Sequence, residues 1–570
     1  MSPEKYSMLR SVKERVTVHR YQVRRTFGVF FKMLLNPLSQ FFLTLSLVFS
    51  FVGVSAFAST SEPDLNCAVA SSESALHLKE PFTVQLDLVN PAAQLDSRFL
   101  SFAMDSSFVF GGKWWDGKSA KVVPPFNFHS AKLTYLTSFL TPAYLRIGGT
   151  EADKVFYDLS AHPVMTPPEH HTVVMNQSEW DAINEFAQKL DLKISFNLNA
   201  GLGARTKQGN WNPNSARELI TYTAAKHYPV EIWELGNEIG FMPFTGNGRV
   251  TSKQYAKDLV EARKLLTELQ PQAKLLANPS AFESWLGDRF DLIGKVLKHS
   301  VSETIQIMSW HYYPEQSSRC KRWLQLRHQN ACKLISPGVL DEAGKWAKLV
   351  NQLLGEESSP AEAWLGETSS ANCGGAPGIS DRYVDGIWWL DELGQMAHEN
   401  QKVVIRQDLV GADYGILGNE NLEPRPNYWN AVIWKHLMGQ TVLNIKSTTP
   451  DRSLRIYAQC TPKTYAEYLP GAVTVLVLNA STAEKVSFGL DKLDELPQWL
   501  YRFGSPHALG QKLFLNGDEL MLNSEGKLPV LSGVKVVPAP GGTPAKHELE
   551  PLAYEFIVIP DAHAPACKNL

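Results

Sequence analysis

The feature that most restricts the fold of this 570-residue chain is an alternation of short apolar runs with amphipathic stretches between residues 98 and 439. Several runs are separated by segments with a helical period, such as 179–190, 252–269 and 382–399. Strands that alternate with helices in this way predict an α/β fold, namely a (β/α)8 TIM barrel. The eight runs that we expect to be its strands are 99–105, 144–149, 193–199, 230–238, 274–279, 305–314, 363–367 and 403–409.

A doubly wound open sheet is the alternative arrangement of such elements. That fold often carries a glycine-rich dinucleotide-binding turn after its first strand. No such turn follows residues 99–105, so the barrel is favoured. Ahead of the helical segment 179–190, Ser178 with Asp181 three residues later resembles a capping box, which predicts the start of that helix.

Beyond residue 439 the pattern changes to β-rich runs separated by turn residues, at 441–447, 453–460, 472–479 and 552–560. These runs predict a C-terminal β-sandwich over residues 440–570. The segment 81–89 is also strand-like and precedes the barrel. We therefore expect residues 59–97 to contribute a strand to the sandwich.

The N-terminal residues 1–58 predict export. Residues 41–58 are apolar, follow a basic stretch and end in Ala-Phe-Ala, which suits signal-peptidase cleavage. A retained N-terminal membrane anchor is the alternative, because about eighteen apolar residues approach the length of a membrane span. Either reading predicts a secreted or extracytoplasmic protein, with attachment through residues 41–58 in the second case.

The net charge restricts the expected partners, and the cysteines indicate possible disulfides. Residues 1–58 hold eight Lys and Arg against two Asp and Glu, so the rest of the chain carries a net charge near −9. A negative field opposes general nucleic-acid binding, and we expect no such partner. All six cysteines follow the apolar segment, and export permits disulfides. Cys320 and Cys332 are close enough to close one loop, and Cys460 and Cys567 could tie two strands of the sandwich.

Polar residues end several of the predicted strands, and in a TIM barrel this end carries the active site. A single strand-end Glu is most often a surface residue. Here, however, Glu238 and Glu367 end the fourth and seventh strands and would face each other across the barrel mouth. Two such carboxyl groups suit glycoside cleavage, in which one protonates the leaving oxygen and the other attacks or activates water. No Cys or His cluster has zinc-ligand spacing, and we expect no metal or organic cofactor.

Four segments together resemble glycoside hydrolase family 79, the heparanase family: WELGNE (233–238), WLGETSSANCGGAP (364–377), AYLRIGGT (143–150) and WHYYP (310–314). The resemblance runs from about Arg98 to the C-terminus. It implies that Glu238 is the acid/base and Glu367 the nucleophile of a retaining enzyme. The implied substrate is a polysaccharide containing β-linked glucuronic acid, heparan sulfate or a related glycosaminoglycan. A Cys460–Cys567 disulfide is implied as well.

The resemblance also implies a substrate pocket. The backbone of a glycine-rich turn and one tyrosine would hold the sugar carboxylate, at Cys373, Gly374, Gly375 and Tyr414. Other matching pocket positions are Asp105, Thr150, Asn237, His311 and Tyr313. Heparanases have Gly where this chain has Cys373, so we expect a differently shaped turn. Only about twenty residues separate Asp158 from Glu179, too few for the excised linker of mammalian heparanases, and a single active chain is expected.

Three functions remain open from the sequence. They are an endo-β-glucuronidase, an exo-β-glucuronidase that releases terminal glucuronic acid, and a non-catalytic glycan-binding homologue. The first two would use the same residues, and the length and charge of the cleft would separate them.

Overall fold

The computed structural model describes residues 82–116, 119–283, 292–301, 303–320, 327–447, 451–538 and 547–568. The expected leader 1–58 and Cys67 lie outside these ranges. All described residues belong to one compact unit. Within these ranges, no helix combines the length and the apolar character needed to cross a membrane.

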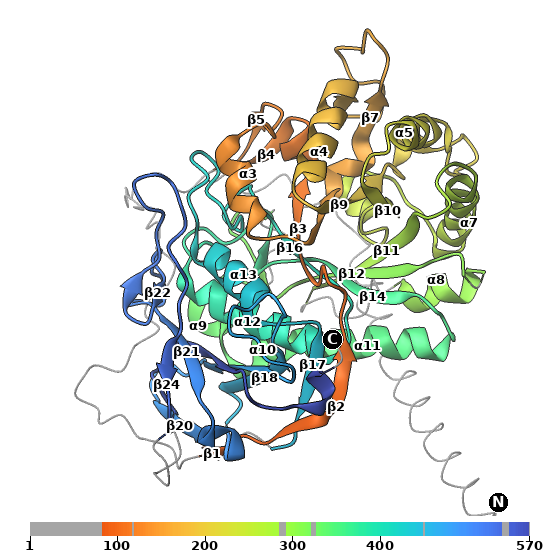
Figure 1. Cartoon of the computed structure of the whole chain (residues 1–570). Helices are drawn as coiled ribbons and strands as arrows, with labels where there is room; N and C mark the ends of the chain where they lie inside the picture. Colours follow the sequence, from red (N-terminus) through yellow and green to blue (C-terminus); the bar gives the residue numbers. More distant parts are fainter. Residues whose placement is uncertain are drawn as a thin grey trace, which may run out of the picture. The chain divides into compact units, whose positions relative to one another are not determined.

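Eight parallel strands close into a barrel, which confirms the prediction and excludes the open sheet (Figure 1). All eight predicted runs contribute a strand. Around the barrel the strands are β3 (Leu100–Asp105), β6 (Ala143–Gly148), β9 (Leu192–Leu198), β10 (Val230–Leu235), β11 (Lys274–Glu283), β12 (Ile307–Tyr313), β14 (Glu362–Thr368) and β16 (Val404–Gln407).

A helix follows each barrel strand before the next one begins, and another follows the last strand. These helices are α3 (Ala131–Ser138), α4 (Gln177–Lys189), α5 (Asn214–Ala225), α7 (Ser252–Leu269), α8 (Ile293–His299), α11 (Glu342–Glu356), α12 (Tyr383–His398) and α13 (Pro426–Leu437). The predicted cap of α4 was wrong by two residues. Asn176, not Ser178, caps the helix, because its side chain accepts from the Glu179 backbone N–H at 3.1 Å while Glu179 bonds back to it.

Short elements decorate the loops of the barrel. Three two-stranded sheets form from β4 (Gly112–Asp116) with β5 (Ser119–Val123), β7 (Val155–Asp158) with β8 (Val173–Asn176), and β13 (Glu315–Gln316) with β15 (Ala371–Asn372). Short helices are α2 (Ser106–Val109), α6 (Met242–Thr245), α9 (Ala331–Leu334) and α10 (Pro337–Leu340), with the 3-10 turns η1 (Thr150–Lys154) and η2 (Leu202–Ala204). Of these, η1, β13 and β15 follow barrel strands at the C-terminal end.

The C-terminal region forms two sheets. The larger one contains β2 (Leu86–Gln94), β17 (Thr441–Ile445), β18 (Leu454–Cys460), β19 (Val473–Asn479), β26 (Ala553–Ile559), β21 (Gln498–Gly504), β22 (Phe514–Leu515), β23 (Asp518–Glu519) and β24 (Val534–Val536). The smaller one contains β1 (Phe82–Thr83), β20 (Val486–Gly489) and β25 (His547–Leu549). The turns η5 (Asp491–Glu495) and η6 (Pro565–Cys567) complete the region. A β-sandwich stays the prediction for its overall form.

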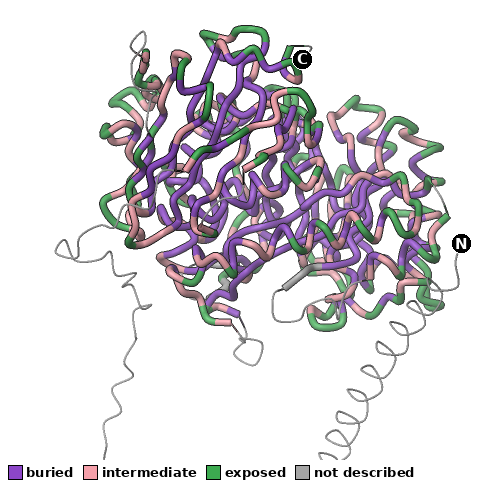
Figure 2. The backbone as a smooth tube through the Cα atoms, turned by 90° about the horizontal axis from the view of Figure 1, so that it is seen from below, coloured by how far each residue is buried: buried purple, intermediate pink, exposed green. Residues whose placement is uncertain are grey.

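The strand expected from residues 81–89 is present, since β2 pairs antiparallel with β17. The larger sheet lies against α12, where the Asp391 carboxylate accepts a hydrogen bond from the Tyr457 hydroxyl at 2.6 Å. Contact with the barrel on one side and the sheet on the other explains why α12 is buried along nearly its whole length. Buried residues run through the interior of the molecule, and exposed residues gather on the outer loops (Figure 2).

The disulfide Cys460–Cys567 is present and joins β18 to η6. The expected pair Cys320–Cys332 was wrong, because Cys320 is bonded to Cys373. Pairing of β13 with β15 places the loop that carries Cys320 beside the loop that carries Cys373. Cys320 therefore pairs with the cysteine that is near in space, Cys373, and not with the one that is near in sequence, Cys332.

Candidate active site

The bottom of the site is a layer of polar side chains that the barrel strands contribute at alternate positions. Tyr144, Ile232 and Leu276 belong to an apolar cluster contributed by the barrel strands. Residues two positions further along each strand share the same face. These residues are Arg146, Glu234 and Asn278, which are all buried and form a polar layer next to the apolar one.

Arg146 is the centre of this polar layer. Its guanidinium donates two hydrogen bonds to Glu234, both at 2.9 Å, and a third to Asn237 Oδ1 at 2.8 Å. A fourth, from Nη1, reaches Glu367 Oε2 at 2.5 Å. The missing side chain of Gly148 makes room, because a Cβ there would lie 2.7 Å from the guanidinium carbon. A buried cation is thus fixed under one of the two predicted catalytic carboxylates.

Glu367 is held as an anion. The Tyr313 hydroxyl donates to Oε1 at 2.5 Å, opposite the bond from Arg146. Burial alone would raise the pKa of Glu367, but attraction to His311 and Arg146 and the hydrogen bonds from Tyr313 and Arg146 outweigh it. The pKa of Glu367 therefore lies below its ordinary value, which suits a nucleophile.

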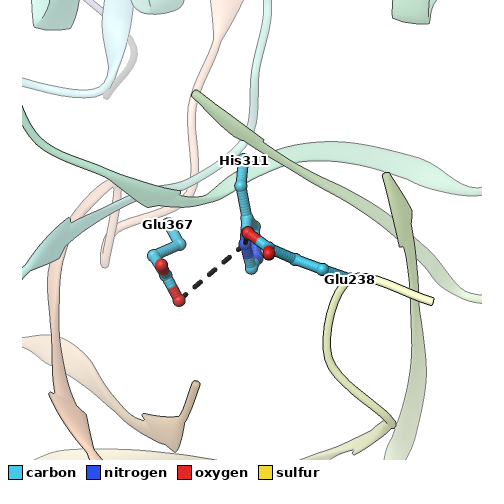
Figure 3. A group of neighbouring side chains, drawn as sticks. All are labelled: Glu238, His311 and Glu367. Carbon is cyan, nitrogen blue, oxygen red and sulfur yellow. Dashed lines mark hydrogen bonds and ion pairs between the residues drawn. The ribbon is translucent and has the colours of Figure 1, made fainter. Parts of the chain in front are cut away.

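Glu238 follows β10 and Glu367 lies near the end of β14, and both carboxyl groups lie near the same nitrogen of His311 (Figure 3). The His311 Nδ1 atom is 2.8 Å from Glu238 Oε1 and 3.8 Å from Glu367 Oε2. Asn278 Nδ2 lies 2.9 Å from His311 Nε2, and we assign a proton to His311 Nδ1, from which the imidazole donates to Glu238. Arg146 is the permanent cation beside Glu367.

The two carboxyl groups and the imidazole are close neighbours. One oxygen of Glu238, one of Glu367 and one nitrogen of His311 all lie within 4.8 Å of one another. These residue types also bind metals. Here, however, Arg146 and Tyr313 already bond to Glu367, and Asn278 bonds to His311. The arrangement suits a nucleophile paired with a proton donor.

Asp105 and Thr150 lie on one side of the barrel mouth. Asp105 Oδ1 accepts from the Ser107 backbone N–H at 2.9 Å and from its hydroxyl at 2.8 Å. Burial raises the pKa of Asp105 to about 7, although the two hydrogen bonds from Ser107 lower it. The negative charge of Glu367 adds to the rise. Gly149 has φ +99° and no space for a side chain, since a Cβ would lie 2.2 Å from Asp105 Oδ2. Thr150 follows it directly.

The glycine-rich turn and Tyr414 lie together on another side. A Cβ on Gly375 would lie 2.7 Å from the Tyr414 backbone nitrogen, so the turn packs directly against the loop that follows β16. The Asp413 N–H donates to the Gly374 carbonyl at 2.9 Å. Burial raises the pKa of Tyr414 far above its ordinary value, so its phenol stays protonated and able to donate.

The structure thus gathers the predicted residues around one barrel mouth, but the sequence-based reasoning missed several supporting ones. Arg146, Glu234 and Asn278 were missed, although a charged residue within an apolar strand run is a signal in itself, because buried charges are paired. Asp153 was missed too, and it accepts from the Asn237 backbone N–H at 2.9 Å. Asp408, which lies within the predicted strand run 403–409, was missed as well. It is fully buried at the end of β16, and neither carboxyl oxygen accepts a hydrogen bond from a described residue.

A barrel whose mouth holds an ionised carboxylate and a second carboxyl group within a few ångströms is built for glycoside cleavage. The chain is therefore a glycoside hydrolase by fold and by site. Comparison with known proteins narrows the class.

The N-terminal domain of glycosyl hydrolase family 79 matches residues 126–394. Mouse heparanase is 30% identical over 485 residues, which cover 77% of this chain and 87% of that protein. Hyaluronoglucuronidase from Hirudo nipponia is 28% identical, covering 85% of this chain and 99% of the relative. The chain belongs to glycoside hydrolase family 79.

Solved structures share the fold at low identity. An α-L-arabinofuranosidase from Thermotoga maritima has a TM-score of 0.60 at 13% identity, covering 84% of this chain and 99% of that one. A 4-O-α-L-rhamnosyl-β-D-glucuronidase from Fusarium oxysporum has a TM-score of 0.59 at 16% identity, covering 84% and 100%. Both are glycosidases with the same overall arrangement.

Proposed function

We propose that this protein is a retaining endo-β-glucuronidase that cleaves heparan sulfate or a related glycosaminoglycan. The separation of the two carboxyl groups carries the proposal. Their nearest oxygens lie within 4.8 Å, whereas inverting enzymes keep the groups about 6.5–9.5 Å apart and retaining enzymes about 5–5.5 Å. A separation this short favours direct attack on the sugar by one carboxylate over activation of an intervening water.

In the first step, Glu367 attacks the anomeric carbon while Glu238 gives its proton to the leaving oxygen. The C–O bond to the leaving group breaks and an ester to Glu367 forms. Arg146 and Tyr313 orient the attacking carboxylate through the two bonds of 2.5 Å. The His311 N–H fixes one oxygen of Glu238, which leaves the other oxygen to carry the transferred proton.

In the second step, water cleaves the ester. Ester formation removes the charge of Glu367, so the now ionised Glu238 can accept a proton from the water. The water oxygen bonds to the anomeric carbon and Glu367 leaves as a carboxylate, again facing Arg146. Two displacements at the same carbon restore its original configuration.

Recognition of glucuronic acid is assigned to the turn at Cys373, Gly374 and Gly375 together with Tyr414. Backbone N–H groups and a protonated phenol are donors, as a carboxylate ligand requires. The names of the mouse and leech relatives support a glucuronide-containing polysaccharide. The disulfides Cys320–Cys373 and Cys460–Cys567 support the further proposal that the protein works in an oxidising, extracytoplasmic compartment.

Product size tests the proposal. Purified protein is incubated with heparan sulfate, with hyaluronan and with an aryl β-glucuronide, and products are analysed by size-exclusion chromatography. Rapid shortening of a polymer supports endo action on it. Free glucuronic acid with unchanged polymer length would instead identify an exo-β-glucuronidase. No turnover of any of the three substrates would contradict the proposal.

Azide rescue tests the nucleophile separately. Glu367→Ala should remove nearly all turnover, and azide should restore part of it by taking the place of the carboxylate, giving a glycosyl azide of inverted configuration. Near-normal activity of Glu367→Ala without azide would refute the assignment.

A further inference from the structure

The turn at residues 373–375 has an unusual backbone. Cys373, Gly374 and Gly375 have φ values of +53°, +86° and +81°. Successive peptides in such a turn can direct their N–H groups into one concavity that binds anions. For Cys373, which has a side chain, this region is unfavourable and persists only where the surroundings hold it.

Arg319 holds the carbonyl side of this turn. Its Nη1 donates to the carbonyl oxygens of Gly374 and Gly375, both at 3.0 Å. Its Nη2 forms an ion pair with the carboxylate of Asp413, whose own N–H bonds to the Gly374 carbonyl. The Arg319 side chain is only 3% exposed and is neutralised by Asp413. Arg319 therefore acts on the turn and is not placed to meet an anionic sugar from solvent.

The neighbouring residue adds a covalent tie. Cys320 is bonded to Cys373, with their Cα atoms 5.4 Å apart. A few residues earlier, β13 pairs with β15, with Glu315 opposite Ala371 and Gln316 opposite Asn372. The segment 315–320 is thus fastened to 371–375 by backbone pairing, by a guanidinium and by a disulfide.

We propose that Arg319, together with the Cys320–Cys373 disulfide, is a positioning element that shapes the turn to bind the substrate carboxylate and so sets the preference for β-glucuronides over neutral β-glucosides. This proposal rests on the proposed function. A turn that is fixed before binding loses little conformational entropy when the sugar binds. The smaller entropy cost makes binding tighter. A glucoside has a hydroxymethyl group in place of the carboxylate and gains nothing from the fixed donors.

The test uses Arg319→Gln with aryl β-glucuronide and aryl β-glucoside, and inhibition by free glucuronate and glucose. We expect KM for the glucuronide and Ki for glucuronate to rise about ten- to a hundredfold, the equivalent of one or two weakened charge-assisted hydrogen bonds. kcat should change far less, and kinetics with the glucoside and glucose should not change. Arg319→Lys should restore part of the loss. The control is Arg263→Gln, since Arg263 also bonds a backbone carbonyl, that of Ala273, but at the opposite end of the barrel.

A second variant serves if Arg319→Gln does not fold. Cys320→Ser with Cys373→Gly removes the disulfide while glycine tolerates the left-handed backbone. It should raise KM for the glucuronide in the same selective way, whereas Cys460→Ser with Cys567→Ser should not. Unchanged KM and Ki in a folded variant, or equal losses on glucuronide and glucoside, would overturn the proposal. Absence of glucuronide hydrolysis by the unaltered protein would refute the proposed function instead. Calorimetry would then decide the positioning proposal, which fails if the unaltered protein binds no glucuronate or if Arg319→Gln binds it equally well.

Discussion

Replacing Arg146 by Gln should damage both the stability and the acid limb of the activity profile. Arg146 is 1% exposed, Glu234 is fully buried, and the closest Arg146–Glu367 contact is 2.5 Å. Removing one partner of a buried ion pair leaves an unpaired charge and costs about 3–5 kcal/mol. Glutamine keeps some hydrogen bonding but none of the charge.

The effect on Glu367 follows from its distance to the guanidinium. With charge centres about 4 Å apart and an effective dielectric constant near 20, the attraction is about 4 kcal/mol, or about 3 pKa units. Relaxation and entering water reduce this, so a rise of about 1–3 units is expected. Because the nucleophile must be ionised, the acid limb of kcat/KM should move to higher pH by the same amount.

The assay is the pH dependence of kcat/KM with an aryl β-glucuronide, together with urea unfolding. Arg406→Gln is the matched control, because Arg406 and Asp385 form another fully buried pair. It should lose comparable stability without moving the acid limb. An acid limb of Arg146→Gln within about 0.3 pH units of the unaltered protein, a factor of two in protonation, would refute the reasoning.

Glu238→Ala should slow hydrolysis most for substrates with poor leaving groups, and azide should accelerate it to give a glycosyl azide of retained configuration; an inverted azide would contradict the assigned role. Burial raises the pKa of Glu392 from 4.5 to about 8, so the folded protein keeps a proton that the unfolded chain releases above pH 4.5. Its contribution to the free energy of unfolding is full below pH 4.5 and falls as pH rises to about 8, by up to about 1.4 kcal/mol per pH unit, and Glu392→Gln should flatten this slope in urea unfolding at several pH values. Cys460→Ser with Cys567→Ser opens a link across 107 residues and should lower the free energy of unfolding by about 2–4 kcal/mol, measured by urea unfolding, with kcat unchanged.

The barrel could be predicted because each of its strands and helices is encoded by a short stretch of sequence. Each strand is a short apolar run, and the sequence between runs has either a helical period or turn residues. The same logic placed Glu238 and Glu367 at strand ends, where parallel strands bring distant residues to one edge. Residue-by-residue resemblance then singled out neighbours such as Tyr313 and Tyr414.

Pairings between loops could not be predicted in this way. The choice of Cys373 over Cys332 as partner of Cys320 depends on the β13–β15 register, which no local pattern encodes. The hydrogen bonds of Arg146 require knowledge of which strands are neighbours and how their registers align. Burial of Asp408 likewise depends on how the loop after β16 folds back over it.

The pairing of β2 with β17 has a consequence for how the chain is made. Gln94 and Thr441, which hydrogen-bond through their side chains at this junction, are 347 residues apart. During synthesis β2 leaves the ribosome long before β17 has been made. The strand β2 therefore stays unpaired while the entire barrel is translated. Such a late, long-range closure is slow and leaves an unpaired strand exposed to other chains. An expression fragment that starts at the first barrel strand would lack β2 and leave β17 as an open edge, prone to aggregation.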